Sequence, residues 1–285
     1  MPTTRVHRIL QSGAVVFPGV YDTLSARIAE QAGFRMAFIS GYAVSATAIG
    51  EPDFGLLSGT EMIDRARSIC ASVSIPIIVD ADTGYGNPLN VHRTVTQLIA
   101  AGAAGCFLED QVWPKRCGHM RNKRVIERES YIQKIRAAVD ARGDRDFFIV
   151  ARTDAEAVIG MDEAIARVVG AREAGADASF VEAPGSREQL AEVGRRSPRP
   201  NVANMIEGGK TPVLPQEEME KLGFDLILYP LTGLYAAAEA LSILYRTLKE
   251  KGTSLSEADR LMAFSRFNEL IGLEKKYALA ERFGE

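Results

Sequence analysis

Residues 76–110 read PIIVDADTGYGNPLNVHRTVTQLIAAGAAGCFLED, and this stretch decides the fold. An apolar run at 76–80 ends in an acidic residue, a helical pattern follows at 91–101, and a second apolar run at 105–109 again ends in an acidic residue. Gly102 follows the helical pattern, and glycine after a helix adopts positive φ at little cost. Apolar runs without polar alternation are typical of parallel strands buried on both faces. The stretch therefore predicts a β/α unit that leads into the next strand.

The same unit recurs along the chain. Eight apolar runs lie at 14–18, 36–40, 76–80, 105–109, 147–152, 178–182, 201–205 and 226–230. Helical patterns lie between them, at 23–32, 60–72, 91–101, 129–141, 161–174, 187–195 and 215–222. Eight β/α units with right-handed crossovers close most simply into a (β/α)8 barrel of the TIM type. A doubly wound open sheet is the alternative.

No low-complexity segment or Pro/Ser-rich linker divides the chain. We therefore expect a single domain over residues 1–285, with a helical extension from about residue 232 to the C-terminus. The extension begins with an Ala/Leu-rich helical pattern at 234–248, and helical sequence continues to residue 282. Its apolar positions at helical spacing need a surface to pack on. That surface is either a neighbouring subunit or the chain's own barrel.

Composition narrows the class of protein. The 285 residues are 46% apolar and 25% charged, an ordinary globular balance. A net charge of −3 argues against a nucleic-acid or anionic-membrane surface. No apolar run reaches 18 residues, so no membrane span is expected, and the N-terminus lacks the apolar core of a signal peptide. Three cysteines without a CxxC pair are typical of reduced thiols. We expect a soluble cytoplasmic protein.

Polar groups stand where the predicted strands end, which is where β/α barrels place their active sites. In chain order they are Ser40-Gly41-Tyr42, Asp80-Ala81-Asp82, Glu109-Asp110, Arg152-Thr153-Asp154, Glu182, Asn204 and Thr232. This regularity predicts one shared site.

Three acidic residues, Asp80, Asp82 and Glu109, follow adjacent strands. Converging carboxylates repel one another and raise a pKa unless a cation neutralises them. Oxygen ligands favour a hard cation, so we expect Mg²⁺, with Mn²⁺ as a possible substitute. The alternative is that an aspartate caps a helix or pairs with an arginine.

The segment Lys115-Arg-Cys-Gly-His119 is the second chemical signal. Cys117 lies beside positive charge in a loop that Pro114 and Gly118 bracket, so a lowered thiol pKa is expected. Such a thiol is a nucleophile or a proton donor. The loop itself is a candidate lid that excludes water. Arg152 and His119 offer donors for a substrate carboxylate.

The remaining cysteines and histidines have no such context. We expect Cys70 and Cys106 to be inert packed thiols, and His7 and His92 to be surface groups.

Together these motifs resemble the isocitrate lyase/phosphoenolpyruvate mutase superfamily over essentially the whole chain. The matching segments are Pro18-Gly-Val-Tyr-Asp22, Ser40-Gly-Tyr42, Pro52-Asp-Phe-Gly55, Asp80-Ala-Asp-Thr-Gly-Tyr-Gly86, Leu108-Glu-Asp-Gln111, Lys115-Arg-Cys-Gly-His119, Ala151-Arg-Thr-Asp154 and Ala203-Asn-Met-Ile-Glu-Gly-Gly-Lys-Thr-Pro212. Asp110-Gln-Val-Trp-Pro114 and Phe264-Ser-Arg-Phe-Asn-Glu-Leu270 favour the branch of petal death protein, dimethylmalate lyase and oxaloacetate hydrolase.

The resemblance implies a barrel whose terminal helix swaps between subunits in a homotetramer, a dimer of dimers. It implies Mg²⁺ near Asp80, Asp82 and Glu109. It further implies a catalytic set and a substrate-binding set that overlap. The catalytic set is Cys117, His119, Arg152 and Tyr42. The substrate-binding set is Ser40, Gly41, Tyr42, Asp53, Gly118, His119, Arg152, Glu182, Asn204 and Thr232.

The implied activity is Mg²⁺-dependent cleavage of a C–C bond in a small 2-hydroxy or 2-oxo dicarboxylate. Candidate substrates are 2-alkylmalates, dimethylmalate, methylisocitrate and oxaloacetate. Cys117 then protonates the departing carbanion, while Tyr42 and a metal-bound hydroxide both stay open as the general base. Side chains around Tyr42, Asp53, Pro184 and Thr232 are expected to set the substituents that the substrate carries.

Two other functions stay open. One is a phosphonomutase acting on carboxyphosphonoenolpyruvate, which resembles this chain in the Cys-Gly-His loop and in Glu207-Gly-Gly-Lys210. The other is a non-catalytic barrel that binds carboxylates.

Overall fold

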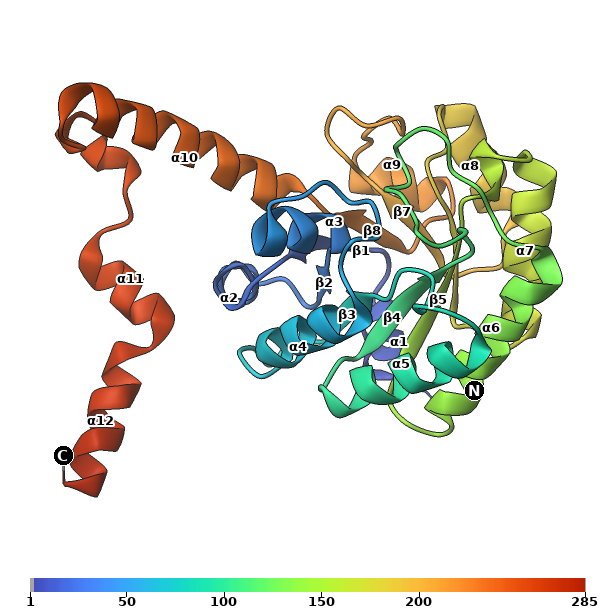
Figure 1. The fold of residues 1–285 in the computed structure, drawn as a ribbon, viewed down its shortest axis with the longest axis horizontal. Coiled ribbons are helices and arrows are strands. Elements are labelled where there is room, and N and C mark those ends of the chain that lie inside the picture. Colours follow the sequence, from blue (N-terminus) through green and yellow to red (C-terminus); the bar gives the residue numbers. More distant parts are fainter. Residues whose placement is uncertain (1–2, 285) are drawn as a thin grey trace. The chain divides into compact units, whose positions relative to one another are not determined.

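Eight parallel strands close into a barrel in the computed structural model, which describes residues 3–284 (Figure 1). The strands are β1 (Val15–Val20), β2 (Ala37–Ile39), β3 (Ile77–Asp80), β4 (Gly105–Glu109), β5 (Phe148–Thr153), β6 (Ala178–Val181), β7 (Asn201–Asn204) and β8 (Leu226–Tyr229). Each strand pairs with the next, and β8 returns to β1 with Val15 opposite Leu226. The predicted (β/α)8 barrel is therefore confirmed, and the open-sheet alternative is wrong.

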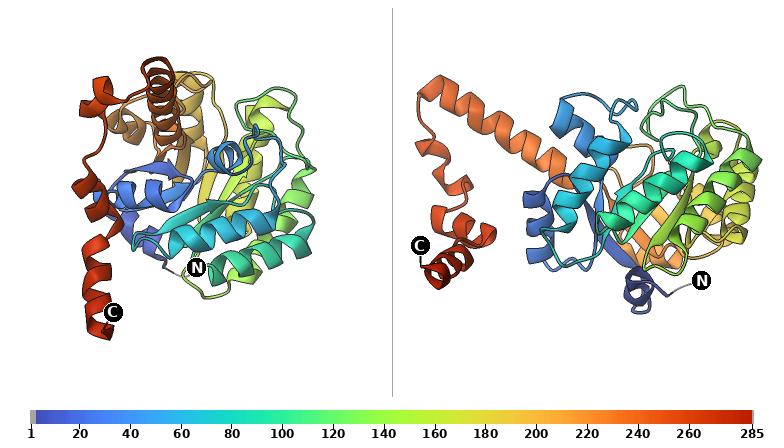
Figure 2. Two further views of the ribbon diagram at one scale, coloured as in Figure 1. Left: turned by 60° about the vertical axis from the view of Figure 1, so that its left-hand side comes forward. Right: turned by 60° about the horizontal axis from the view of Figure 1, so that its bottom comes forward.

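Helices surround the strands in both further views (Figure 2). They are α2 (Thr23–Gln31), α4 (Gly59–Cys70), α5 (Pro88–Ala100), α6 (Arg128–Arg142), α7 (Met161–Glu173), α8 (Arg187–Arg196) and α9 (Gln216–Lys221). The next helix along the chain is α10 (Thr232–Lys251). Asn87 caps α5 by accepting from the backbone N–H groups of Leu89 and Asn90. Gly102 follows α5 with a φ of 89°, so it is the expected stop, and it leads directly into β4.

Several short helices were not predicted. They are α1 (Arg5–Leu10), α3 (Gly41–Val44), the π-helix η1 (Ser45–Ile49), and the 3₁₀ helix η2 (Ala155–Ala157). The 3₁₀ helix η3 (Leu255–Arg260) lies in the C-terminal extension, where helical sequence was expected. One or two turns are too short to display a hydrophobic period. Val6 of α1 packs with Phe17 in the cluster that fills the barrel interior. Helix α1, dark blue in Figure 2, thereby covers one end of the barrel.

The interior of the barrel is packed with aromatic side chains. Phe38, Phe107 and Phe180 are buried there, and the rings of Phe38 and Phe107 lie 4.5 Å apart. Side chains fill the interior, and a β/α barrel binds its ligands at the end formed by the carboxyl ends of the strands. The polar residues at the ends of the strands lie at this end of the barrel.

The chain divides into two compact units, one up to Thr232 and one from Gly233 onward. The second unit holds most of α10, then η3, α11 (Phe264–Ile271) and α12 (Leu273–Phe283). Several of its large apolar side chains, including Leu255, Phe264 and Phe283, are exposed. Helix swapping between subunits stays a prediction. In the described part of the chain, no helix is both long and apolar enough to span a membrane.

Candidate active site

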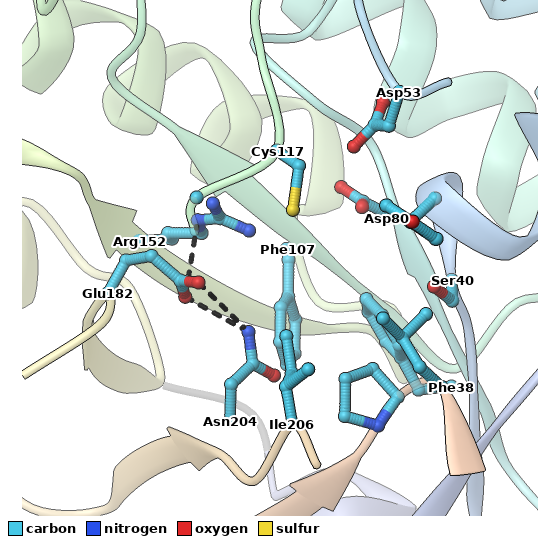
Figure 3. A pocket seen from close by; sticks show the side chains of 14 residues that line it. Phe38, Ser40, Asp53, Asp80, Phe107, Cys117, Arg152, Glu182, Asn204 and Ile206 are labelled. Atoms are coloured by element: carbon cyan, nitrogen blue, oxygen red, sulfur yellow. Dashed lines mark hydrogen bonds and ion pairs between the residues drawn. The ribbon is translucent and has the colours of Figure 1, made fainter. Parts of the chain in front are cut away.

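A pocket of about 400 Å³, measured with its open mouth, lies at the carboxyl ends of the strands (Figure 3). Strand ends and loops that the sequence singled out supply its polar lining, which comprises Ser40, Tyr42, Asp53, Asp80, Cys117, Gly118, Arg152, Glu182 and Asn204. Apolar residues that it did not single out complete the wall, namely Phe38, Phe107, Ile206, Pro230 and Leu231. The pocket thus combines a charged side with an apolar side.

Arg152, from β5, is the buried cation of the site. Its Nε lies 3.0 Å from Asp154 Oδ2, 3.2 Å from Glu109 Oε2 and 3.8 Å from Glu182 Oε2. Burial alone would lower the pKa of Arg152, but these carboxylates raise it well above its usual value. The guanidinium therefore stays charged, and it faces the pocket with its orientation fixed by Asp154.

Glu182 lies beside Arg152, accepts hydrogen bonds from Asn204 and is contacted by His119. Asn204 Nδ2 donates to both carboxylate oxygens, at 3.0 and 3.3 Å, and His119 Nε2 lies 3.2 Å from Oε1. Burial opposes ionisation of Glu182, yet Arg152 and His119 bring its pKa down to about 2. Glu182 is therefore an ionised acceptor at neutral pH.

Asp80 and Asp82 form the acidic side of the site. Asp80 accepts hydrogen bonds from the backbone N–H groups of Gly41, at 3.3 Å, and Asp82, at 3.1 Å. Burial raises the pKa of Asp82 to about 7, with help from Asp80 and against the opposing effect of Lys115. Lys115 Nζ lies 2.7 Å from Asp82 Oδ1, so the chain itself supplies one cation to these carboxylates. The sequence did not reveal this partner.

The fit of the acidic residues to Mg²⁺ is indirect. No three His, Cys, Asp or Glu side chains among residues 3–284 are grouped closely enough to hold an ion by themselves. However, Oε1 of Glu109 is buried without a hydrogen-bond partner, and the Asp80 carboxylate lines the pocket. Mg²⁺ usually keeps several waters and binds one or two protein carboxylates together with substrate oxygens. The oxygen-only set of Asp80, Asp82 and Glu109 fits such a hydrated ion.

Cys117 corrects one expectation. Its Sγ points into the pocket (Figure 3), and its thiol is largely removed from water. Burial raises the pKa of Cys117 to about 11, and the positive charge of Lys115 does not compensate. The predicted lowering of the pKa was wrong because burial dominates, and the negative charges of Asp53 and Glu182 add to the rise. The thiol is consequently protonated, which suits a proton donor and not a nucleophile.

Hydrogen bonds on both sides of Cys117 hold its loop against the barrel. Lys123 Nζ donates to the Gly118 carbonyl oxygen at 2.6 Å and to Asp154 Oδ1 at 2.7 Å. At the other side, the backbone N–H of Cys117 donates to the carbonyl oxygen of Asp53 at 3.1 Å. We call residues 111–125 the lid, since Gln111 and Val125 form the bridge at its base.

Not every predicted residue lines the pocket. His119 contacts Glu182 but does not itself line the pocket. Gly41 contacts Asp80 through its backbone N–H. Thr232 is exposed, and its hydroxyl group donates to Glu207 Oε1 at 2.5 Å. Asp82 and Glu109 also lie outside the lining.

The remaining cysteines and histidines lie away from the pocket. His92 is exposed, as expected, and pairs with Asp140 at 3.4 Å. His7 was expected at the surface but is partly buried against Phe148, and burial lowers its pKa. Burial raises the thiol pKa values of Cys70 and Cys106, in agreement with packed, unreactive thiols.

The family described as phosphoenolpyruvate phosphomutase matches residues 7–249. The chain belongs to the phosphoenolpyruvate mutase/isocitrate lyase superfamily. Members of this superfamily are named lyases and mutases, and the chain is an enzyme of this kind.

Curated superfamily members of both kinds are similar to the chain. It is 54% identical to a chloroplastic carboxyvinyl-carboxyphosphonate phosphorylmutase of Arabidopsis thaliana, over 98% of the chain and 84% of the relative. It is 51% identical to the petal death protein of Dianthus caryophyllus, over 98% and 89%. It is 44% identical to 2,3-dimethylmalate lyase of Eubacterium barkeri, over 92% and 90%.

Solved structures of the superfamily share the fold closely. Oxaloacetate acetylhydrolase in complex with 3,3-difluorooxalacetate matches with a TM-score of 0.93 and 35% identity, covering 98% of this chain and 96% of that one. Phosphonopyruvate hydrolase in complex with oxalate and Mg²⁺ matches with a TM-score of 0.89 and 31% identity, covering all of both chains.

Proposed function

We propose that the chain is a lyase that cleaves the C2–C3 bond of a small 2-hydroxy or 2-oxo dicarboxylate, with Cys117 as the proton donor. One observation carries the proposal: a buried thiol, with its pKa raised to about 11, points into a pocket lined by Arg152 and Glu182. Cleavage of a C–C bond leaves an electron pair on carbon that needs a proton. The protonated thiol meets this need of the lyase reaction; because the mutase shares the Cys-Gly-His loop, the choice between the two activities rests on the substrate experiments below.

The reaction balances without any external oxidant. A base removes the proton of the 2-hydroxyl, the C2–C3 electrons move to C3, and C2 becomes the carbonyl of a 2-oxo acid. The C3 half is an enolate of a carboxylate until the Cys117 thiol transfers its proton to carbon. For a 2-oxo substrate, the hydrated carbonyl supplies the hydroxyl and an acid is released instead. Tyr42 lines the pocket and is one candidate base, so the base stays open.

Binding follows from the charges of the lining. Arg152 offers N–H groups to a substrate carboxylate, and its charge is fixed by its acidic neighbours. Glu182 is ionised and repels a carboxylate, so it accepts from a hydroxyl group instead. Phe38, Ile206 and Leu231 form an apolar wall that suits an alkyl substituent.

Mg²⁺ is part of the proposal, and Asp80, Asp82 and Glu109 would hold it together with water. When bound, Mg²⁺ supplies Lewis-acid stabilisation of negative charge on the substrate oxygens. The carboxylates of the chain supply the ligands, and Gly41 keeps Asp80 oriented through its backbone N–H. Mn²⁺ would fit the same oxygen ligands.

The test is a substrate panel of oxaloacetate, 2-methylmalate, 2,3-dimethylmalate, methylisocitrate and isocitrate, with products identified by NMR and an EDTA control. The proposal expects metal-dependent cleavage of at least one compound. It also expects Cys117→Ser to lose about 10²- to 10⁴-fold in kcat, the usual value of a general acid. Cys70→Ser, at a half-buried thiol on α4, is the matched control and should retain activity. Full activity of Cys117→Ser would exclude the acid role.

The second candidate is a carboxyphosphonoenolpyruvate mutase. The 54% identity to the Arabidopsis thaliana mutase favours it. Incubation with that phosphonate and ³¹P NMR decides between the two: a new phosphorus–carbon product, with no cleavage across the dicarboxylate panel, would support the mutase.

We further propose that the chain forms a homotetramer through the unit that begins at Gly233. Its exposed apolar side chains, among them Tyr245, Phe264 and Phe283, support an interface between copies. Sedimentation velocity on the full chain tests this, and a monomer at micromolar concentration would contradict it. The cytoplasmic location and the absence of nucleic-acid and membrane partners stay predictions.

A further inference from the structure

His119 lies between two loops and a strand end. The backbone N–H of Lys210 donates to His119 Nδ1 at 3.0 Å, while His119 Nε2 lies 3.2 Å from Glu182 Oε1. His119 belongs to the lid, and Lys210 lies 91 residues further along, in the loop between β7 and α9. The imidazole therefore connects the lid, the β7–α9 loop and the pocket.

The hydrogen bonds decide where the ring proton lies. A backbone N–H is only a donor, so Nδ1 must accept and cannot carry a proton. In a neutral imidazole the single proton is then on Nε2, the nitrogen that faces the carboxylate of Glu182. Nε2 makes no hydrogen bond in this geometry, but the ionised carboxylate of Glu182 lies only 3.2 Å away, so a small rotation of the ring would let the Nε2–H donate to it.

We propose that His119 is a positioning residue, fixed as the neutral Nε2–H tautomer by the peptide N–H of Lys210, and that it orients Glu182 for the substrate hydroxyl. The inference rests on the proposed function, because Glu182 acts there as the hydroxyl acceptor. His119 was expected to be a catalytic and substrate-binding residue. In this arrangement it acts through Glu182, because the lid holds its Nε2 3.2 Å from that carboxylate.

Glycine at position 209 makes the contact possible. A Cβ on Gly209 would lie 2.8 Å from His119 Nδ1 and 3.0 Å from Ile206 Cβ. Both distances are shorter than normal van der Waals contacts. Gly209→Ala must therefore displace the imidazole or the loop. Gly185→Ala is the matched control, since Gly185 follows β6 and its added methyl group would meet only Gln189 Oε1, at 3.4 Å.

The direct test is ¹⁵N NMR of histidine-labelled protein, and it is tractable because the chain has three histidines. Assignment uses His7→Gln and His92→Gln variants. The proposal expects a pyridine-like Nδ1 and a pyrrole-like Nε2 for His119, lost or shifted in Gly209→Ala and kept in Gly185→Ala. An Nδ1–H tautomer or a doubly protonated ring in the wild-type protein would overturn the proposal, as would an unchanged signal in Gly209→Ala.

Kinetics provide the second test. A Gln side chain places its amide N–H near the position of Nε2, whereas the shorter Asn side chain reaches only the position of Nδ1. His119→Gln should keep kcat/KM within about tenfold of the wild type, and His119→Asn should lose about 10²-fold, the cost of a misplaced group. Equal losses in both variants would overturn the donor role. If no dicarboxylate is cleaved, the proposed function fails, while the NMR test still decides the tautomer.

Discussion

The ammonium nitrogen of Lys115 lies 2.7 Å from Asp82 Oδ1 and 2.7 Å from Asp53 Oδ1. A residue of the lid thus inserts its positive charge among carboxylates that would otherwise repel one another. Burial lowers the pKa of Lys115, but Asp82 and Asp53 outweigh that effect and raise the pKa well above its usual value. Lys115 of the lid and a divalent cation would therefore both neutralise the carboxylate of Asp82.

Lys115→Met should tighten the binding of a divalent cation to the substrate-free enzyme. Two unit charges about 4 Å apart near a protein surface interact by up to about 4 kcal/mol, and lid opening reduces this, so we expect roughly tenfold tighter binding. Mn²⁺ titration followed by EPR measures it, and kcat should fall because Asp53 loses its partner. Lys221→Met, at an exposed lysine of α9, is the control. An unchanged Mn²⁺ affinity would show that Lys115 and the cation do not compete.

Cys117 should be alkylated slowly near neutral pH. The thiolate is the reactive form, and with a pKa of about 11 only about one thiol in 10³ is ionised at pH 8. Raising the pH deprotonates the thiol, so the rate with iodoacetamide should rise about tenfold per pH unit between pH 7 and 10. Peptide mass spectrometry measures the rate at Cys117. A plateau above pH 9 would mean that the pKa is lowered after all.

Gly118→Ala should inactivate the enzyme without unfolding it. An added Cβ would lie 2.4 Å from Glu182 Cγ and 2.5 Å from Arg152 Nη2, so one of these groups must move. Misplacement of a binding group by about 1 Å costs about 10²-fold, and we expect at least that loss in kcat/KM. The melting temperature, followed by circular dichroism, should change little because position 118 lies in a loop. Activity equal to that of Gly185→Ala would contradict the placement of Gly118.

The barrel was predictable because each strand is buried on both faces and several helices end at a glycine. Gly33, Gly102, Gly175 and Gly223 all have positive φ and each precedes a strand. The strand-end residues of the pocket were predictable for a related reason, since closure of a parallel barrel brings the carboxyl ends of all strands to one rim. Asp80, Arg152 and Asn204 needed no further information to be placed together.

The lid was not predictable in the same way. Its residues are placed by contacts with distant parts of the chain, such as Lys115 with Asp53 and His119 with the peptide group of Lys210. The sequence showed positive charge beside Cys117, but not that Asp53 and Asp82 already neutralise it. The direction of the pKa shift at Cys117 follows from burial, which a local motif does not reveal.

Lys123 joins the lid to the barrel. Its ammonium group donates to the carbonyl oxygen of Gly118 and to Asp154, the same carboxylate that orients Arg152. The side chain is almost fully buried, so water does not screen these contacts. Loss of the ammonium group would free the lid next to Cys117, while Arg152 would still neutralise Asp154 and preserve the barrel.

Lys123→Met should therefore loosen the lid more than it destabilises the protein. We expect kcat to fall at least about tenfold, because the lid positions the proton donor and excludes water from the carbanion. Trp113 is the single tryptophan of the chain, lies in the lid and packs edge-on against Tyr85 at 5.7 Å, so its fluorescence reports on the lid. Acrylamide should quench it more in Lys123→Met than in the wild type or in Lys221→Met. Unchanged quenching together with unchanged kcat would mean that the lid does not depend on Lys123.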